Sequence, residues 1–338
     1  MEACLSFVSG GDKAGGVLQA FILGAGLGTR LRPLTERVPK PLVPLFHRPL
    51  AEWALEACAA AGAGCFAINT HHLPELWHDP VLGLPTAPPP ATGTQVADNG
   101  VRVRHALWHD MPAAYFHEPV LLETGGGIRN LSPWLDGSTL LVHNGDIFTT
   151  LPLEKLLAAH RASGLPVTLA LRSEGDAKHI ALDTSGARIT DIRGMLGRAQ
   201  GSHVFTGVYC IEPEFLGLIP QHEKISVIPA FLELAKAGKL GAVTLDDGVW
   251  VDLGDRTSYL RAHRELALAP PVHPECHISS GATVERSVIG PGAVVENGAV
   301  VRDSVVWPGC RVTDGAVLDR CIVFSGTPAA GRHADEDL

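Results

Sequence analysis

A glycine-rich turn near the start of the chain is followed closely by at least three cationic side chains. Such a turn presents successive backbone N–H groups, which can bind an anion at close range. Prolines flank Lys40 and stiffen the backbone that carries it. The glycines alone are equally typical of an ordinary strand-to-loop turn, but together with the cations they predict a binding site for a polyphosphate. The residues concerned are Gly24, Gly26, Gly28, Arg30, Arg32 and Lys40.

Two aspartates further along the chain are candidate ligands for Mg²⁺. Asp146 ends the string N-G-D, and Asp252 is the first aspartate of the string W-V-D-L-G-D. Carboxylate oxygens are ligands that Mg²⁺ prefers, although either string alone is also typical of a simple turn. The two aspartates are 106 residues apart, so only the fold can bring them together.

An α/β domain must position these residues. The apolar run from Leu18 to Leu23 predicts a buried strand that ends in the glycine turn. A helix from Pro49 to Ala61 and a strand from Cys65 to Asn69 follow, and this β-loop-α-β order opens a doubly wound domain. Ligands of such domains bind beyond the carboxyl ends of the strands. Further strands are predicted at 138–143, 166–172 and 204–211, and further helices at 153–160 and 225–237.

Three consecutive glycines, Gly125 to Gly127, stand before the string I-R-N-L-S-P-W-L. They predict a flexible turn that precedes a helix. This turn serves either as a simple helix entry or as a surface without side chains, on which a flat base can lie.

The segment 79–100 differs from its surroundings in composition. Prolines, glycines and threonines crowd together there, and no periodicity is present. The segment predicts an insertion, which is either a disordered surface loop or a lid over the ligand.

Residues 278–326 repeat with a period of 17, which Gly281, Gly298 and Gly315 mark. Seventeen divides into six, six and five, the pattern of a hexapeptide repeat whose short strands form the sides of a triangular coil. Because fewer than three coils are present, we expect a packing or assembly role rather than an acetyltransferase site, and a homo-oligomer through these coils. Apolar residues are expected to mark the corners and stack inward at Ile289, Val295, Val301, Val306, Val312 and Leu318.

The composition narrows the class of protein. With 338 residues and 46% hydrophobic composition, the chain can bury a sizeable core. A net charge of −9 disfavours a nucleic-acid partner, and no apolar span of about 18 residues suggests a membrane helix. The first 17 residues are typical of a loose extension rather than a secretory signal. Seven scattered cysteines without a C-x-x-C pair favour a cytoplasmic protein with reduced thiols.

The string G-x-G-T-R-L-x-P-L-T, followed by P-K-P-L, resembles the signature of the sugar-1-phosphate nucleotidyltransferases, or nucleotide-sugar pyrophosphorylases. The strings F-T-G-V-Y and W-V-D-L-G-D are similar to two later motifs of that family. The resemblance implies an α/β fold: a doubly wound mixed sheet (a Rossmann-like nucleotidyltransferase domain) followed by a short left-handed β-helix. The implied divisions are an extension at 1–17, the transferase domain at 18–266, the β-helix at 274–328 and a polar tail at 329–338.

The resemblance also implies an activity, in which a sugar 1-phosphate and a nucleoside triphosphate give a nucleotide sugar and pyrophosphate, with Mg²⁺ as cofactor. Arg30 would stabilise the departing pyrophosphate, and Lys40 would bridge the two reacting phosphates. Asp146 and Asp252 would hold the metal. The implied nucleotide-binding residues are Leu23, Gly24, Ala25, Gly26, Gly28, Thr29, Arg30, Thr124, Gly125 and Gly126. The implied sugar-binding residues are Glu123, Asn144, Gly145, Thr206 and Gly207.

Departures from the family pattern bear on the substrate. Glu123 stands where glycine is usual, and the resulting E-T-G-G-G is similar to the N-acetylmuramate-1-phosphate uridylyltransferases, which implies UTP. The appended β-helix is instead similar to the mannose-1-phosphate guanylyltransferases, which implies GTP. The family's lysine for the sugar phosphate is missing, and Arg193 or Arg198 is a candidate substitute. A non-catalytic subunit that binds a nucleotide sugar is a second class, but Lys40 and both aspartates are present.

Overall fold

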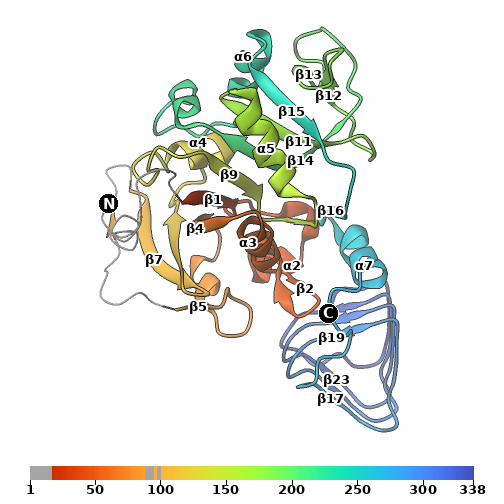
Figure 1. Cartoon of the computed structure of the whole chain (residues 1–338). Helices are drawn as coiled ribbons and strands as arrows, with labels where there is room; N and C mark the ends of the chain where they lie inside the picture. The colour runs from red at the N-terminus through yellow and green to blue at the C-terminus, as the bar shows by residue number, and fades with distance from the viewer. Residues whose placement is uncertain (1–16, 88–94, 97–99) are drawn as a thin grey trace. The chain divides into compact units, whose positions relative to one another are not determined.

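The computed structural model describes residues 17–87, 95–96 and 100–338 (Figure 1). These residues form two compact units, and each unit draws on separate stretches of the chain. The first contains the described residues of 1–26, 53–74 and 85–250, and the second contains 27–52, 75–84 and 251–338. Nearly all of the predicted extension at 1–17, and part of the predicted insertion at 79–100, lie outside the described residues.

The first unit is built on a mixed sheet, which has ten strands within the described residues. At its centre β1 (Leu18–Leu23) runs parallel to β4 (Ala63–Thr70) and to β9 (Leu140–Asn144). β14 (Val204–Ile211) is antiparallel to both of its neighbours. The strand order is β15-β11-β14-β9-β1-β4-β8-β7-β5, with β6 beside β7. The other bounds are β5 (Thr86–Ala87), β6 (Gln95–Val96), β7 (Arg102–Trp108), β8 (Met111–His117), β11 (Val167–Arg172) and β15 (Leu240–Thr244).

The register aligns the carboxyl ends of three parallel strands. Leu23, the last residue of β1, is opposite Asn69 of β4 and Asn144 of β9. Phe21 and Val142, which precede this end, have no exposed surface. A packed core therefore fixes the edge at which ligands bind in sheets of this kind.

Helices pack on this sheet. α5 (Leu153–Ser163) packs against β11, β14 and β15, and α6 (Ile228–Lys236) packs against β15 and against β13 (Ile189–Ile192), a strand of a separate two-stranded sheet (Figure 1). α3 (Leu50–Ala60) lies between β1 and β4 along the chain. The predicted strands and helices of this domain are confirmed, with ends that differ by at most three residues. The shorter elements are β10 (Ile147–Thr149), β12 (Ile180–Leu182), β13 (Ile189–Ile192), η3 (Pro74–His78), η4 (Pro213–Leu218) and β16 (Trp250–Asp252).

The glycine run differs from the prediction, because Gly125 to Gly127 lie inside α4 (Glu123–Arg129) and not in a turn before a helix. The backbone N–H groups of Gly125 and Gly126 donate to the carbonyl oxygen of Ile225 at 2.8 and 3.1 Å. A Cβ at Gly125 would lie 2.8 Å from that oxygen. These glycines let a helix approach another backbone closely, and this packing overrides their low helix propensity.

The second unit contains the β-helix, whose parallel strands form three faces. The first face holds β17 (His277–Ile278), β20 (Val294–Val295) and β23 (Arg311–Val312). The second face holds β18 (Thr283–Glu285), β21 (Val300–Arg302), β24 (Val317–Asp319) and β26 (Arg332–Ala334). The third face holds β19 (Val288–Ile289), β22 (Val305–Val306) and β25 (Ile322–Val323). The fold class that the sequence predicts is therefore confirmed.

The apolar residues of the repeat are buried as predicted, but they lie within strands and do not mark the corners. Ile289, Val295, Val301, Val306, Val312 and Leu318 are at most 1% exposed. The corners are formed instead by residues with positive φ. These are Gly292 and Gly309 at one corner, Gly298 and Gly315 at the second, and Arg286, Asp303 and Arg320 at the third.

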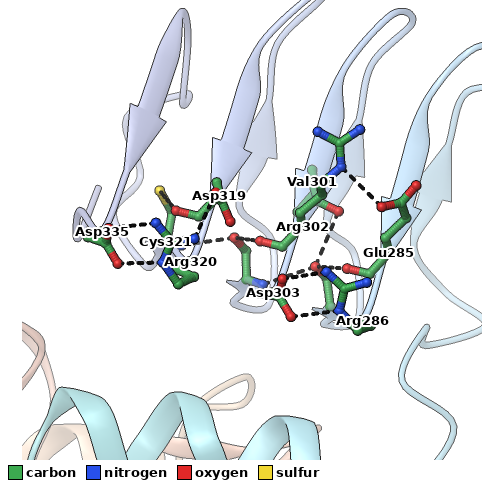
Figure 2. A network of polar contacts seen from close by, with 11 residues as sticks. Glu285, Arg286, Val301, Arg302, Asp303, Asp319, Arg320, Cys321 and Asp335 are labelled. Atoms are coloured by element: carbon green, nitrogen blue, oxygen red, sulfur yellow. Dashed lines mark hydrogen bonds and ion pairs between the residues drawn. The ribbon is translucent and has the colours of Figure 1, made fainter.

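Ion pairs between coils hold the third corner, where positive φ is unfavourable because the residues are not glycine. Arg286 donates to both carboxylate oxygens of Asp303, at 2.8 and 2.6 Å (Figure 2). Arg320 does the same with Asp335, at 2.7 and 2.8 Å. Such two-point pairs are among the stronger hydrogen-bonded contacts, so they stabilise the stacking of successive coils.

Residues 329–338, which we expected as a polar tail, continue the coils. β26 pairs with β24 in parallel, with Arg332 opposite Val317, a step of 15 residues instead of 17. Leu338 N donates to Ile322 O at 2.8 Å. The sequence does not reveal this coil because its period changes and its residues are polar. The homo-oligomer through the coils stays a prediction.

The second unit also contains the loop that carries the cations of the predicted polyphosphate site, Arg30, Arg32 and Lys40. Its elements are η1 (Thr29–Leu31), α2 (Leu34–Arg37), η2 (Lys40–Leu42), β2 (Pro44–Leu45) and β3 (Arg48–Pro49). α7 (Arg256–Glu265) packs against β2. β2 and α7, which are far apart in the sequence, therefore pack together within this unit.

Two further observations concern location. No helix among the described residues has the length and apolar character that a membrane span requires. Cys65 is disulfide-bonded, so the expectation of reduced thiols fails at that residue. A cytoplasmic location stays a prediction. The cysteines with free thiols are Cys58, Cys210, Cys276, Cys310 and Cys321.

Candidate active site

The second unit brings together Arg30, Lys40 and Asp252. The carboxylate of Asp252 lies 3.6 Å from Arg30 Nη2 and 3.7 Å from Lys40 Nζ. The side chain of Lys40 is 6% exposed, whereas that of Arg30 is 68% exposed. The contact with Arg30 is therefore screened by solvent, and the contact with Lys40 is the stronger of the two.

Two glycines make room for these cations. A Cβ at Gly28 would lie 2.8 Å from Lys40 Cβ, and Gly28 has a φ of +61°. A Cβ at Gly254 would lie 2.8 Å from Arg30 Nη1. Thr35 Oγ1 donates to Gly28 O at 2.9 Å and fixes the turn. The sequence reasoning missed Gly254, although the glycine of W-V-D-L-G-D could have indicated it.

In the first unit, the start of the glycine turn is fixed by a side chain. Asn69 Oδ1 accepts hydrogen bonds from Gly24 N at 2.7 Å and from Ala25 N at 3.3 Å. Because Asn69 ends β4 beside β1, the register of the sheet places this acceptor under the turn. The two predicted nucleotide-binding residues Gly24 and Ala25 therefore use their N–H groups within the protein.

Asn69 also connects the turn to α4. Asn69 Nδ2 donates to Glu118 Oε1 at 2.8 Å, and Leu122 N donates to Glu118 Oε2 at 3.0 Å. Asn69 and Glu118 are 2% and 1% exposed. Burial raises the pKa of Glu118, against the hydrogen bonds from Asn69 and Leu122 that lower it. Neither residue was predicted from the sequence. Asn69 lies near the end of the apolar strand β4, and Glu118 directly follows β8.

The backbone conformation of Glu123 is one that glycine adopts more readily than other residues. Glu123 has a φ of +60° at the start of α4, a conformation that costs a residue with a Cβ about 1–2 kcal/mol. Its carboxylate lies 3.8 Å from Lys224 Nζ, and both side chains are about half exposed. The next residue, Thr124, accepts a hydrogen bond from Val227 N at 3.0 Å.

The other predicted sugar-binding residues lie at the end of β9, with Asn144 and Gly145, and within β14, with Thr206 and Gly207. Gly145 N donates to Leu23 O at 2.9 Å, which joins the residue after β9 to the end of β1. A Cβ at Gly207 would lie 2.6 Å from Asn144 Nδ2. Thr206 has no exposed surface, and its hydroxyl donates to Ala170 O at 2.8 Å. The side chain of Thr206 is therefore occupied within the sheet.

The predicted metal ligands Asp146 and Asp252 belong to different units. Within residues 17–87, 95–96 and 100–338, no cluster of three or more His, Cys, Asp or Glu side chains could hold a metal by itself. Mg²⁺ is commonly held by one or two carboxylates plus the substrate's phosphates. Asp146 and Asp252 are carboxylates of the type that such a site uses. A Mg²⁺ site shared by both residues stays a prediction.

The two candidate substitutes for the missing lysine differ. Arg198 Nη1 donates to Ala235 O at 3.2 Å, and Arg198 N donates to Asp191 Oδ2 at 2.9 Å. Arg198 therefore ties its own loop to α6. Arg193 and Arg198 are both exposed in the loop after β13. Because the guanidinium of Arg198 is engaged with Ala235 O, Arg193 is the better candidate for a phosphate contact.

Three curated proteins are similar to this chain. Mannose-1-phosphate guanylyltransferase of Mycobacterium tuberculosis is 28% identical over 286 residues, which cover 82% of this chain and 73% of the relative. UTP–glucose-1-phosphate uridylyltransferase of Synechocystis is 26% identical over 262 residues, which cover 73% of this chain and 63% of the relative. N-acetylmuramate alpha-1-phosphate uridylyltransferase of Neisseria meningitidis is 28% identical over 241 residues, which cover 70% of this chain and 93% of the relative.

A solved structure matches the fold, and two family models match the sequence. The apo structure of a UDP-glucose pyrophosphorylase superposes with a TM-score of 0.55 and 16% identity, covering 73% of this chain and 96% of that one. The profile described as GlmU-like, C-terminal hexapeptide, matches residues 261–328. The profile described as Nucleotidyl transferase matches residues 19–268. The chain therefore belongs to the nucleotidyl transferase family, in the sugar-1-phosphate group to which these three curated relatives belong.

Proposed function

We propose that this chain transfers a uridylyl group from UTP to N-acetylmuramate 1-phosphate, which gives the nucleotide sugar and pyrophosphate. The observation that carries the transferase reaction is the buried Lys40, which is ion-paired to Asp252 beside Arg30. A buried cation that has a carboxylate partner and an exposed cation next to it suits a site for two phosphorylated reactants.

The chemistry requires positioning and charge rather than a general base. An oxygen of the sugar phosphate is already ionised near neutral pH, because the second pKa of a phosphate monoester is about 6. That oxygen forms a bond to the α-phosphorus, and the bond from the α-phosphorus to the bridging oxygen breaks, so pyrophosphate leaves with its electron pair. Lys40 neutralises the two reacting phosphates, and Arg30 stabilises the charge on the departing group.

Backbone groups would hold the nucleotide. Gly24 N and Ala25 N are bound by Asn69, so within this proposal the later residues of the turn, Gly26 to Thr29, contact the triphosphate. Gly125 and Gly126 are buried against the backbone near Ile225, so within this proposal they shape the start of α4 and do not touch the base directly. Mg²⁺, held by Asp146 and Asp252, would supply positive charge to the phosphates when bound.

The string E-T-G-G-G, which is similar to the N-acetylmuramate-1-phosphate uridylyltransferases, supports N-acetylmuramate as the sugar. A carboxylate in a strained conformation, with Lys224 at 3.8 Å, indicates a local role, because strain of this kind concentrates at functional sites. The muramate relative is also covered over 93% of its length. The alternative is GTP with mannose 1-phosphate, which the Mycobacterium tuberculosis relative favours because it is matched over 82% of this chain.

The test is a matrix of substrates. The purified chain is incubated with Mg²⁺, each of the four nucleoside triphosphates, and the 1-phosphates of N-acetylmuramate, mannose and glucose, and pyrophosphate release is measured. The proposal expects the highest kcat/KM with UTP and N-acetylmuramate 1-phosphate. A preference for GTP and mannose 1-phosphate would replace the substrate assignment, and no release with any pair would favour the non-catalytic subunit.

A variant sharpens the substrate assignment. Glu123→Gly removes the backbone strain at position 123, because glycine adopts a positive φ readily. This variant should lower selectivity for N-acetylmuramate over the other sugars. Asp110→Gly is the matched control, because Asp110 has a φ of +63° in the turn between β7 and β8. Equal selectivity in wild type and the Glu123 variant would remove Glu123 from sugar recognition.

A further inference from the structure

A buried chain of hydrogen bonds runs from the β-helix to the loop that carries Lys40. Trp307, which follows β22, donates from Nε1 to the hydroxyl oxygen of Tyr259 at 3.0 Å. Tyr259, on α7, donates from that hydroxyl to Pro44 O at 2.6 Å. Trp307 is 2% exposed and Tyr259 is not exposed. We call these three residues the Trp307 relay.

A second contact joins α7 to the same loop. Phe46 N donates to His263 Nε2 at 3.0 Å, and the two rings stack with centroids 5.3 Å apart. Because Nε2 accepts, Nδ1 carries the proton and donates to Tyr259 O at 2.9 Å. Phe46 is 3% exposed. The loop is therefore held to α7 at both Pro44 and Phe46.

Both partners of the Lys40–Asp252 pair are placed by these contacts. Val43 N donates to Lys40 O, so η2 leads directly into the held residue Pro44. On the other side, Asp252 lies three residues before Asp255, which caps α7 through a reciprocal hydrogen-bond pair with Ser258.

The β-helix in turn fixes the start of α7. Arg256 Nη2 donates to Arg320 O at 2.6 Å, and Arg256 Nε donates to Asp337 at 2.7 Å. Both acceptors belong to the last coils. A shift of the coils would therefore change α7 and, through it, the distance from Lys40 to Asp252.

We propose that Tyr259 and Trp307 are positioning residues, through which the hexapeptide-repeat domain sets the geometry of Lys40 for transfer. This inference rests on the proposed transferase reaction and assigns the β-helix a role beyond packing and assembly. It predicts that removing one hydroxyl on α7 slows the reaction even though Tyr259 touches no substrate.

The test uses substitutions that keep the rings. Tyr259→Phe removes the hydrogen bond to Pro44 O and should lower kcat about tenfold, the effect of losing one buried hydrogen bond between ordered groups. Trp307→Phe leaves the contact from Tyr259 to Pro44 intact and should have a smaller effect. The matched controls are Tyr209→Phe and Trp108→Phe, because Tyr209 Oη and Trp108 Nε1 are buried without a hydrogen-bond partner in the described structure. These two variants should keep the wild-type kcat.

Two further readouts separate positioning from simple destabilisation. Hydrogen exchange of the peptide 38–47 should rise in Tyr259→Phe and stay unchanged in Tyr209→Phe. In the Lys40→Met background, Tyr259→Phe should lower the residual rate less than twofold, because the relay acts through Lys40. Full additivity of the two variants, or an unchanged kcat in Tyr259→Phe, would overturn the inference. An inactive wild type would instead contradict the proposed function.

Discussion

The two units present their functional residues in opposite ways. In the first unit, buried hydrogen bonds of Asn69 and Glu118 join the glycine turn to α4 and fix their backbone, and Asp146 is the charged residue predicted to hold a metal. In the second unit, the functional groups are charged side chains, and Lys40 meets Asp252 across 212 residues of sequence. The first arrangement is fixed by a sheet register, whereas the second is fixed by contacts among a loop, α7 and the β-helix.

This difference predicts which substitutions matter most. Within the proposed reaction, a charged side chain that faces the phosphates or the metal acts directly on the reacting groups, so its loss should remove a large electrostatic contribution. A hydrogen bond in the first unit acts by shaping backbone, so its loss should have a smaller effect. The variants below test this ranking, starting with the largest expected effect.

The first comparison takes one aspartate from each unit. Asp146→Asn and Asp252→Asn keep the size of the side chain and remove its negative charge. If both carboxylates hold Mg²⁺, each variant should lose activity by orders of magnitude without a change in the circular dichroism spectrum, and metal removal from wild type should give the same loss. Full activity in either variant would remove that aspartate from the metal site.

The second comparison separates the two cations. Lys40→Met should lower the rate of transfer about 10²- to 10³-fold, the cost of losing one preorganised charge contact, and should also raise the KM for the sugar 1-phosphate. Arg30→Met should chiefly weaken the use of pyrophosphate in the reverse reaction. Lys155→Met is the control, because Lys155 pairs with Asp247 at an exposed site and such pairs contribute little. Wild-type rates in both test variants would show that the loop does not bind phosphate.

The third comparison moves to the first unit. Asn69→Ala leaves Gly24 N and Ala25 N without their acceptor and should raise the KM for the nucleotide about tenfold, since each unmade buried hydrogen bond costs about 1–3 kcal/mol. Glu118→Gln keeps one acceptor oxygen and should have a smaller effect. Steady-state kinetics with the nucleotide varied decide this. A larger loss of kcat in Asn69→Ala than in Lys40→Met would reverse the proposed ranking of the units.

The sequence predicts the first unit well and the second unit in part. β1 and β14 have the predicted bounds, because buried strands have short apolar runs that end at glycine or polar residues. Lys40 and Asp252 could be named from motifs, but their contact could not, because neither motif carries information about the other. Asn69 and Glu118 were missed since a single polar residue at the end of a strand is common. The coil formed by 329–338 was missed because backbone pairing requires no apolar pattern.

The last comparison concerns histidines buried in the two units, with the smallest expected effect on activity at pH 7. Burial lowers the pKa of His143 in the first unit and of His263 in the second to about 4, whereas unfolded histidine has a pKa of about 6.5. Between these values the unfolded chain binds more protons, so the free energy of unfolding should fall as the pH falls from 7 to 4.

Each histidine should contribute about 2 kcal/mol of this loss between pH 7 and pH 5, as the difference between the two pKa values requires. His143→Phe and His263→Phe should each reduce the pH dependence of urea unfolding by that amount. At pH 7 both variants should also destabilise the chain, since Phe46 N loses its acceptor in His263→Phe and Asn144 O loses its contact with His143 Nδ1 in His143→Phe. An unchanged pH dependence in both variants would show that other groups control acid unfolding in both units.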